Sequence, residues 1–347
     1  MNRSDLDIVV TGRAAISAAG IGLVPLAEAV RTERSSLRPV PPDPAGDGSI
    51  LWGNVEDFRV GDFIPPLKAR KLDRCSQMAV AAAGMAIKDA GIDTGSVDPL
   101  RIGIILGSGF GGIGNSSEFL TGYFTAGMEG LAPMLFPNTV ANAPASNASI
   151  EHGIKGPNVT IVQRFCSAET ALVFACRYLE EGRADVVITG GVDELTPLMI
   201  RGFRSMGQQR RFAAGFGEGC GLLVLERREH AARRGAAIRG SIDAIRSVGI
   251  FLKGAEDEGI VRIIPPGTSC ALVTLSGTAD LTPVLLNRLP EVPRLDLAPI
   301  TGRSLAMGGL SLVAQFLSLA GSDRGFYLAA SPEGPYISLD VTGGPTV

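Results

Sequence analysis

A cysteine at the boundary between a predicted strand and a predicted helix is the residue best placed for chemistry. Cys166 stands in GPNVTIVQRFCSAETAL, residues 156–172, where a strand-like run gives way to a helix-like one. A helix N-terminus can lower the pKa of a thiol, which favours the nucleophilic thiolate. A catalytic thiol also needs a nearby base or cation, and the oxyanion that it forms needs hydrogen-bond donors. The rest of the chain must supply these groups if Cys166 is catalytic.

Histidine, the usual general acid or base near neutral pH, is scarce in this chain. The 347 residues include two histidines, His152 and His230. His152 precedes a turn-like GIKG, and His230 lies in a predicted basic helix. Catalytic groups are usually presented on loops at strand ends, and neither histidine is predicted there. We therefore expect both to be structural or surface residues, and we expect Cys166 to be a small buried residue.

The composition argues against several functional classes. The five cysteines show no CxxC spacing, which disfavours a zinc site or a redox dithiol, and the chain lacks a secretory context for disulfides. A net charge of −3 gives no sign of nucleic-acid binding. The glycine run at 107–112 lacks the lysine of a phosphate-binding loop. No apolar run reaches the roughly 18 residues that span a bilayer, so we expect a cytoplasmic protein without membrane or metal sites.

Strand-like and helix-like segments alternate along the chain. A strand is predicted at 7–12, and an Ala-rich amphipathic helix over 73–93 ends near Gly91. Residues 101–112 read as a buried strand that enters a glycine loop, 139–154 as a helix of small residues, and 167–183 as a helix. Continuous apolar strands between helices predict an α/β fold whose sheets are covered on both faces. The pattern repeats more loosely after residue 235, which predicts two related halves, 1–235 and 236–347.

Several segments together resemble the β-ketoacyl synthases. They are DIVVTGRAAISAAGIG, RKLDRCSQMAVAAAGMAIKDAGID, FPNTVANAPASNASIEHGIKGPNVTI, GRADVVITGGVDEL and GFGEGCGLLVLERREHAARRG. The resemblance covers about two thirds of the chain. It implies a thiolase-like fold with five layers, αβαβα, built from two pseudo-repeated halves. It also implies a dimer in which each subunit contributes to an acyl tunnel.

The resemblance also marks the positions of the family's catalytic residues, and each position holds another residue here. Counting from Gly-Pro at 156–157, or back from Gly-Gly at 190–191, places Phe165 at the nucleophilic cysteine and Cys166 one residue beyond. LSGTADLTP has Ser276 where the first family histidine stands. APITGRSLAMGGL has Arg303 for the second histidine and Ala298 for the lysine. Loss of a whole cooperating set removes condensation activity. Arg303 is interpreted either as solvated or as facing a carboxylate across an interface.

A synthase-like chain without catalytic residues resembles a chain length factor, the ketosynthase β subunit of type II polyketide synthases. This implies a heterodimer with a catalytic ketosynthase and contact with an acyl carrier protein, whose phosphopantetheine makes a resident cofactor unnecessary. The product is expected to be a reduced or polyene chain. By position, the tunnel and partner interface are expected to be lined by Gly112, Ile113, Gly114, Asn115, Ser116, Phe119, Leu135, Phe136, Asn138 and Thr139.

Three alternatives remain open at the level of sequence. One is a divergent acyltransferase or condensing enzyme that uses Cys166. A second is a scaffold subunit that stabilises a synthase without setting product length. A third is a homodimer that binds acyl chains.

Overall fold

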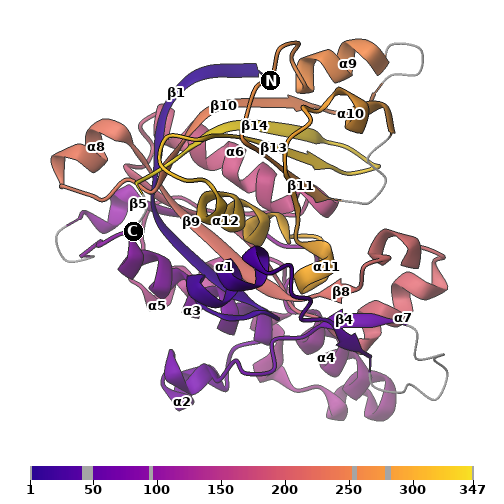
Figure 1. Cartoon of the computed structure of the whole chain (residues 1–347). Coiled ribbons are helices and arrows are strands. Elements are labelled where there is room, and N and C mark those ends of the chain that lie inside the picture. Colours follow the sequence, from indigo (N-terminus) through magenta and orange to yellow (C-terminus); the bar gives the residue numbers. More distant parts are fainter. Residues whose placement is uncertain (1, 41–49, 94–96, 252–255, 278–282, 346–347) are drawn as a thin grey trace.

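The fold can be described for most of the chain. The computed structural model describes residues 2–40, 50–93, 97–251, 256–277 and 283–345 (Figure 1). The predicted irregular segment 37–66 is therefore only partly described, and TADLT of the LSGTADLTP motif (278–282) lies outside the described residues. No helix in the described ranges is long and apolar enough to cross a bilayer.

Eleven strands of the described chain form one hydrogen-bonded sheet. One half has the order β1 (Asn2–Ser17), β9 (Gly219–Arg227), β7 (Val186–Asp193), β5 (Ile102–Gly107) and β6 (Asn158–Ile161). The other has the order β10 (Gly240–Val248), β14 (Tyr336–Gly343), β13 (Arg324–Ala330), β11 (Leu272–Gly277) and β12 (Arg294–Asp296). The eleventh strand, β2 (Gly20–Ile21), pairs with β1.

The two halves of the sheet share their pairing pattern as well as their order. In each half the last three strands pair in parallel, and the other two pairings are antiparallel. The first strands of the halves, β1 and β10, pair with each other in antiparallel fashion and join the halves into one sheet. The α/β fold with repeated halves is thus confirmed. The division into domains 1–235 and 236–347 stays a prediction, since β10 continues the sheet that β1 begins.

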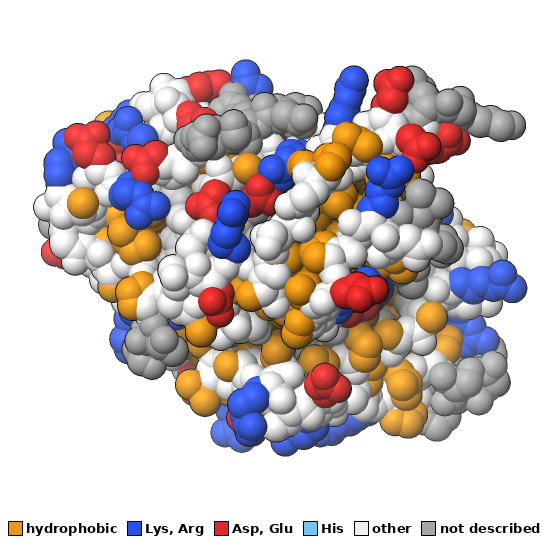
Figure 2. Space-filling view, turned by 45° about the horizontal axis from the view of Figure 1, so that its top comes forward, with side chains coloured by type: hydrophobic (Ala, Val, Ile, Leu, Met, Phe, Trp, Pro, Cys, Tyr) orange, Lys and Arg blue, Asp and Glu red, His pale blue; other side chains and the backbone are white. Residues whose placement is uncertain are grey.

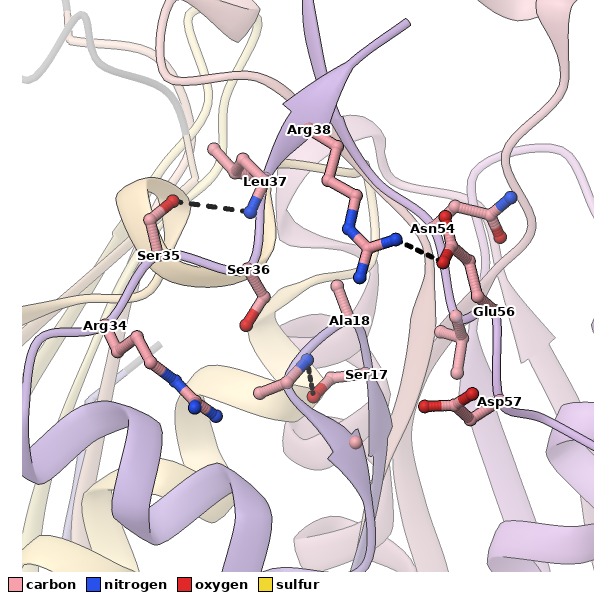
Figure 3. A pocket seen from close by; sticks show the side chains of 13 residues that line it. Ser17, Ala18, Arg34, Ser35, Ser36, Leu37, Arg38, Asn54, Glu56 and Asp57 are labelled. Atoms are coloured by element: carbon pink, nitrogen blue, oxygen red, sulfur yellow. Dashed lines mark hydrogen bonds and ion pairs between the residues drawn. The ribbon is translucent and has the colours of Figure 1, made fainter. Parts of the chain in front are cut away.

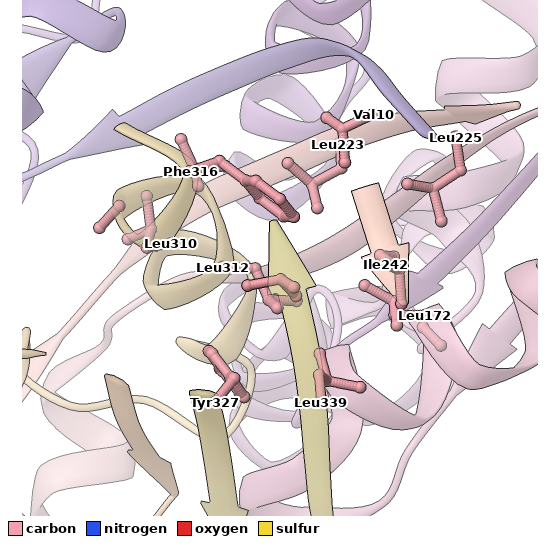
Figure 4. Packing of buried hydrophobic residues seen from close by; sticks show 14 of the residues in the cluster. Val10, Leu172, Leu223, Leu225, Ile242, Leu310, Leu312, Phe316, Tyr327 and Leu339 are labelled. Carbon is pink, nitrogen blue, oxygen red and sulfur yellow. The ribbon is translucent and has the colours of Figure 1, made fainter. Parts of the chain in front are cut away.

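Helices cover the sheet halves in five layers. The outer face of the first half packs against α3 (Arg74–Asp89) and α5 (Ala143–Glu151). Between the halves lie α6 (Ser167–Glu180) and α12 (Gly308–Ser318), in the largest apolar core (Figure 4). The outer face of the second half packs against α9 (Glu256–Ile263) and α10 (Pro283–Arg288). Because neighbouring residues of a strand point to opposite faces, strands such as β5, β7 and β9 supply two of these cores.

The local boundaries follow ordinary helix signals. α3 begins after Asp73, whose carboxylate accepts a hydrogen bond from the amide of Ser76, and Gly91 has a positive φ of 61° just beyond the end. The predicted helix at 139–154 is shorter in the structure, because residues 140–142 form a turn before α5.

The remaining elements frame the site. The helices are α1 (Leu23–Arg31), α2 (Pro66–Ala69), α4 (Ile113–Ala126), α7 (Pro197–Ser205), α8 (Arg228–Arg233) and α11 (Ala298–Thr301). The 3₁₀ turns are η1 (Val60–Asp62), η2 (Pro99–Arg101), η3 (Gly127–Gly130), η4 (Pro133–Asn138), η5 (Arg164–Cys166) and η6 (Gln209–Phe212). A small sheet has the order β3 (Arg38–Pro39), β4 (Leu51–Gly53) and β8 (Phe216–Gly217).

Candidate functional site

A tight turn connects β6 to α6 and carries the residues that the sequence singled out. The turn η5 contains Phe165 and Cys166, and Arg164 before them has a positive φ of 50°. The Ser167 hydroxyl accepts a hydrogen bond from the amide of Gln163 at 2.9 Å and donates one to the carbonyl of Arg164 at 2.8 Å. These bonds hold a strained backbone of the kind that often occurs at functional sites.

Phe165 is buried in a cluster of aromatic rings. Its side chain is 1% exposed, and its ring lies 5.6 Å from the ring of Phe212. The ring of Phe212 in turn lies 4.2 Å from that of Phe216 and 4.6 Å from that of Phe203. We call Phe165, Phe203, Phe212 and Phe216 the aromatic cluster. These rings fill the space at the position that the family resemblance assigns to the nucleophile.

Cys166 is also buried, and its surroundings disfavour a thiolate. Its Sγ donates a hydrogen bond to the carbonyl oxygen of Pro335 at 3.3 Å. Burial, with a smaller contribution from the charge of Glu169, raises the pKa of the Cys166 thiol well above its ordinary value. Desolvation therefore opposes the effect that the helix N-terminus would have on this thiol.

Both histidines have partners far from this thiol in the sequence. The Nε2 atom of His152 lies 2.8 Å from the carbonyl oxygen of Val80. The Nδ1 atom of His230 lies 2.6 Å from a carboxylate oxygen of Glu226. Neither contact involves the turn at Cys166, and the described residues contain no group of acidic, Cys and His side chains that could hold a metal ion.

A buried carboxyl group next to Cys166 was not found by sequence reasoning. Glu169, on the first turn of α6, lies 2.7 Å from the hydroxyl of Tyr327, and this hydroxyl lies 3.2 Å from the carbonyl oxygen of Gly308. Burial raises the pKa of Glu169. The Tyr327 hydroxyl therefore links the Glu169 carboxyl to the backbone at Gly308, and the second carboxyl oxygen, Oε2, is buried without a hydrogen-bond partner among the described residues. A Cβ at Gly308 would lie 2.1 Å from Glu169 Oε1, so the carboxyl requires glycine there.

The only sequence signal for Glu169 was a charged residue on the apolar face of a helix. Its neighbours Ala168, Ala171 and Leu172 are buried. Ser276, at the position of the first family histidine, is buried beside Glu169 and Tyr327. A hydroxyl thus stands where the resemblance expects an imidazole.

Arg303 is buried rather than solvated, so that interpretation was wrong. It is 5% exposed, its Nη1 atom donates to the carbonyl oxygen of Gly277, and its Nη2 atom lies 3.6 Å from Asp296 Oδ2. The carboxylate that it faces belongs to the same chain. Ala298, the residue at the family's lysine position, is buried at the start of α11 and carries no charge. Arg303 therefore ties the end of β11 to the loop after α11.

Two adjacent acids at the end of β7 hold the loops around this region. Asp193 accepts hydrogen bonds from the amides of Gly109 at 2.6 Å and Ala306 at 2.7 Å. Glu194 accepts one from the amide of Gly114 at 2.5 Å. Burial raises the pKa of Asp193 to about 6 and that of Glu194 to about 7. Both carboxyl groups accept hydrogen bonds from main-chain amides of the same chain, and these bonds hold the surrounding loops in place.

Part of the predicted tunnel lining faces the chain's own interior. The amide of Gly114 bonds to buried Glu194, and a Cβ built on Gly114 would lie 3.2 Å from that carboxyl. The Ser116 hydroxyl donates to the carbonyls of Gly112 and Thr139. Asn138 is buried and donates to the carbonyl of Lys71. Enlarging Gly114 or Ser116 would therefore press on this chain first.

The other predicted lining residues are more accessible. Ile113, Asn115, Phe119 and Leu135 are half-buried, and Phe136 is exposed. The rings of Phe119 and Phe136 lie 5.8 Å apart and connect α4 to η4. Phe119 and Phe136 thus contact each other, and both are at least partly exposed at the surface.

Helix α4 and the turns after it carry large apolar side chains into solvent. None of the fourteen residues of α4 is buried. We define the α4–η4 face by its exposed hydrophobic residues, which are Leu120, Tyr123, Phe124, Met128, Met134 and Phe136. Figure 2 shows that apolar side chains also gather in a band across the face displayed there. A helix with no buried side chain and so many exposed apolar ones is typical of a protein interface.

Comparisons with known proteins agree with this architecture. The model of the family described as β-ketoacyl synthase, N-terminal domain, matches residues 5–231. A 3-oxoacyl-[acyl-carrier-protein] synthase 2 of Synechocystis is 28% identical, over 90% of this chain and 85% of the relative. The enzyme of the same name from Staphylococcus aureus is 32% identical, but the match spans 55% of this chain and 52% of the relative.

Solved structures match over nearly the whole chain. A structure titled the ishigamide ketosynthase/chain length factor has a TM-score of 0.82 and 22% identity, and the match covers 97% of this chain and 98% of that one. A type II polyketide synthase acyl-carrier protein in complex with its ketosynthase bound to the hexaketide gives a TM-score of 0.81 and 21% identity, covering 98% of this chain and 100% of that one. At these identities the likeness confirms the thiolase-like fold.

Proposed function

Since this chain belongs to the β-ketoacyl synthase family, we propose that it is a non-catalytic subunit, a chain length factor, that pairs with an active ketosynthase and shapes the acyl tunnel. The observation that carries this proposal is the buried ring of Phe165 within the aromatic cluster. A condensing enzyme must bring an acyl thioester to its nucleophile, and here a buried aromatic ring occupies the position that the resemblance assigns to that nucleophile.

The groups that assist condensation are replaced along with the nucleophile. Ser276 and Arg303 stand at the positions where the resemblance places two histidines, and Arg303 is committed to Gly277 and Asp296. A hydroxyl cannot act as a base near pH 7, and a guanidinium stays protonated. Neither Ser276 nor Arg303 can therefore serve as the general base that a histidine would provide at its position.

The α4–η4 face supports a protein partner. A stable obligate interface buries a large apolar surface, and a free subunit would expose this one to water. The ishigamide ketosynthase/chain length factor, and a type II polyketide synthase acyl-carrier protein in complex with its ketosynthase, are examples of such pairing in this fold. The catalytic partner would supply cysteine and histidines and would receive the acyl carrier protein, and the phosphopantetheine arm would arrive on that carrier.

Phe119 and Phe136 are the residues that we assign to the tunnel floor. Their ring centroids lie 5.8 Å apart, Phe136 belongs to the α4–η4 face, and Phe119 is half-buried beside it, where a partner would enclose both. A floor stops chain growth because one more extension unit would overpack it at a cost of about 1–3 kcal/mol. Such a cost discriminates between successive lengths by about 5-fold to 150-fold.

Co-expression with a catalytic ketosynthase tests both pairing and length control. We expect the two chains to copurify, and we expect Phe119→Ala with Phe136→Ala to lengthen the product. The matched control is Val24→Ala, since Val24 is 80% exposed on α1, outside the α4–η4 face. A changed yield with unchanged length would instead favour a scaffold, and a stable homodimer that binds acyl chains would contradict the pairing.

A divergent condensing enzyme is the second candidate, and the relatives named 3-oxoacyl-[acyl-carrier-protein] synthase 2 favour it. Its thiol would be Cys166. Mass spectrometry of the isolated chain after incubation with an acyl donor decides between the two candidates. We expect no acyl group on Cys166, and we expect Phe165→Cys alone to give no elongation because no base is added. Acylation of Cys166 followed by elongation would refute the non-catalytic assignment.

A further inference from the structure

A polar hollow lies apart from the aromatic cluster and from the α4–η4 face. Its volume is about 350 Å³. It is formed by the turn between β1 and β2, the loop after α1 and the segment after β4 (Figure 3). The residues that line it are Ser17, Ala18, Ala19, Gly20, Arg34, Ser35, Ser36, Leu37, Arg38, Asn54, Val55, Glu56 and Asp57.

The charges in the hollow are separated onto two walls. The loop after α1 carries Arg34 and Arg38, and the segment after β4 carries Glu56 and Asp57. Arg38 and Glu56 form an ion pair at 2.5 Å. Among the described residues, neither the guanidinium of Arg34 nor the carboxylate of Asp57 takes part in a hydrogen bond or ion pair. One cation and one anion therefore remain on opposite walls.

The wall that carries Arg34 is fixed by the backbone. Glu33 has a positive φ of 49°, and Glu33 and Arg164 are the non-glycine residues with positive φ in the described part of the chain. The amide of Arg34 donates to the carbonyl of Ala29 at 3.0 Å, and the amide of Ser36 donates to that of Ile300 at 2.8 Å. A strained backbone held by such bonds is found more often at binding sites than elsewhere.

The opposite wall is anchored to a partly buried ion pair. The amide of Val55 donates to Glu218 at 2.8 Å, and Arg74 donates to the carbonyl of Val55 at 2.7 Å and to Asn54 at 3.3 Å. Arg74 and Glu218 are themselves paired at 2.6 Å. Both walls are thus positioned before a ligand arrives, which reduces the entropy lost on binding.

A buried hydroxyl completes the floor. Ser17 is 0% exposed and lines the hollow, and its Oγ accepts a hydrogen bond from the amide of Ala19 at 3.2 Å. This bond uses an oxygen lone pair and leaves the hydroxyl hydrogen as a donor. The floor and the Ser36 hydroxyl can therefore donate to an anionic group near Arg34.

We propose that this hollow binds a small zwitterion, with its carboxylate or phosphate at Arg34 and Ser36 and its ammonium group at Asp57. A simple anion would meet the repulsion of Asp57, and a simple cation would meet that of Arg34. A ligand with both charges satisfies the two walls at once. This site is independent of the proposed pairing with a ketosynthase, because it shares no lining residue with that surface.

Calorimetric titration of the full-length chain with four probes tests the proposal. The zwitterions are β-alanine, with a carboxylate, and O-phosphoethanolamine, with a phosphate. The single-charge controls are inorganic phosphate and ethanolamine. We expect at least one zwitterion to bind about tenfold or more tightly than both single-charge probes, since it forms one ion pair more. The preferred zwitterion then identifies the anionic group.

Variants assign the two charges to their residues. Arg34→Gln and Asp57→Asn should each remove the tenfold preference, whereas Arg31→Gln should keep it. Arg31 lies at the end of α1, pairs with Glu28 and does not line the hollow. Any of three results overturns the proposal. Neither zwitterion gives a binding heat, or phosphate alone binds as tightly as the better zwitterion. The third is that Arg31→Gln loses the preference for the zwitterion to the same extent as Arg34→Gln. Thermal melting of each variant confirms that it is folded.

Discussion

Replacing Phe165 by alanine would test directly whether this ring is part of the core. The ring is 1% exposed and contacts the ring of Phe212 at a centroid distance of 5.6 Å. Core Phe→Ala substitutions cost about 3–5 kcal/mol, because transfer free energy is lost and a cavity remains. Phe165→Leu keeps much of the volume, and we expect it to cost about 1.5 kcal/mol or less. The matched control is Phe124→Ala, since Phe124 is 79% exposed and its loss should change stability by about 0.5 kcal/mol at most.

Urea unfolding followed by circular dichroism measures these differences, provided that the m-value stays constant. Benzene gives a second readout, because an apolar cavity in a protein core stays dry and can bind it. We expect benzene to raise the melting temperature of Phe165→Ala and to leave the wild type unchanged. A core role for this ring is refuted if Phe165→Ala lowers the free energy of unfolding by less than about 1 kcal/mol, or if Phe124→Ala lowers it equally.

Three further predictions address the acids, the surface and the thiols. The native pKa of Glu194 is about 7 against an ordinary 4.5, so native protein binds more protons and the free energy of unfolding falls as pH rises from about 4.5 to 7. The difference of 2.5 units corresponds to about 3 kcal/mol, and Glu194→Gln should flatten this dependence in melts between pH 4.5 and 8; an unchanged slope would contradict it. Phe124→Glu should abolish copurification with the ketosynthase, whereas Val24→Glu should keep it, and equal binding of both variants would exclude the α4–η4 face. Cys166 should react with a thiol reagent only on unfolding, whereas partly exposed Cys270 should react in the native protein, and peptide mass mapping distinguishes them.

Local structure could be predicted from the sequence. The alternation of apolar strands and helices predicted the α/β fold, and the amphipathic pattern with Gly91 as its stop signal predicted α3. Counting along GPNVTIVQRFC placed Phe165 on the turn between β6 and α6. These predictions succeeded because they depend on residues that are close together along the chain.

The surroundings of each site residue needed the tertiary structure. The hydroxyl of Tyr327 reaches Glu169 across 158 positions of sequence, and buried Arg303 contacts Gly277. The amide of Gly114, on the first turn of α4, bonds to Glu194, the residue that follows β7 and lies 80 positions along the chain. A periodic pattern states which face of an element is apolar, but not which distant element packs against it.

Phe165 stands where the resemblance expects a sulfur, and this was determined by the sequence alone. Only the packing of α6, η6 and β8 decided two further properties. Phe212 and its neighbours cover the ring of Phe165, and the Cys166 thiol beside it is desolvated. The physical reason is that residue identity is a local property of the chain. Burial, and with it the pKa of a thiol or a carboxyl, depends on every segment that the fold brings around it.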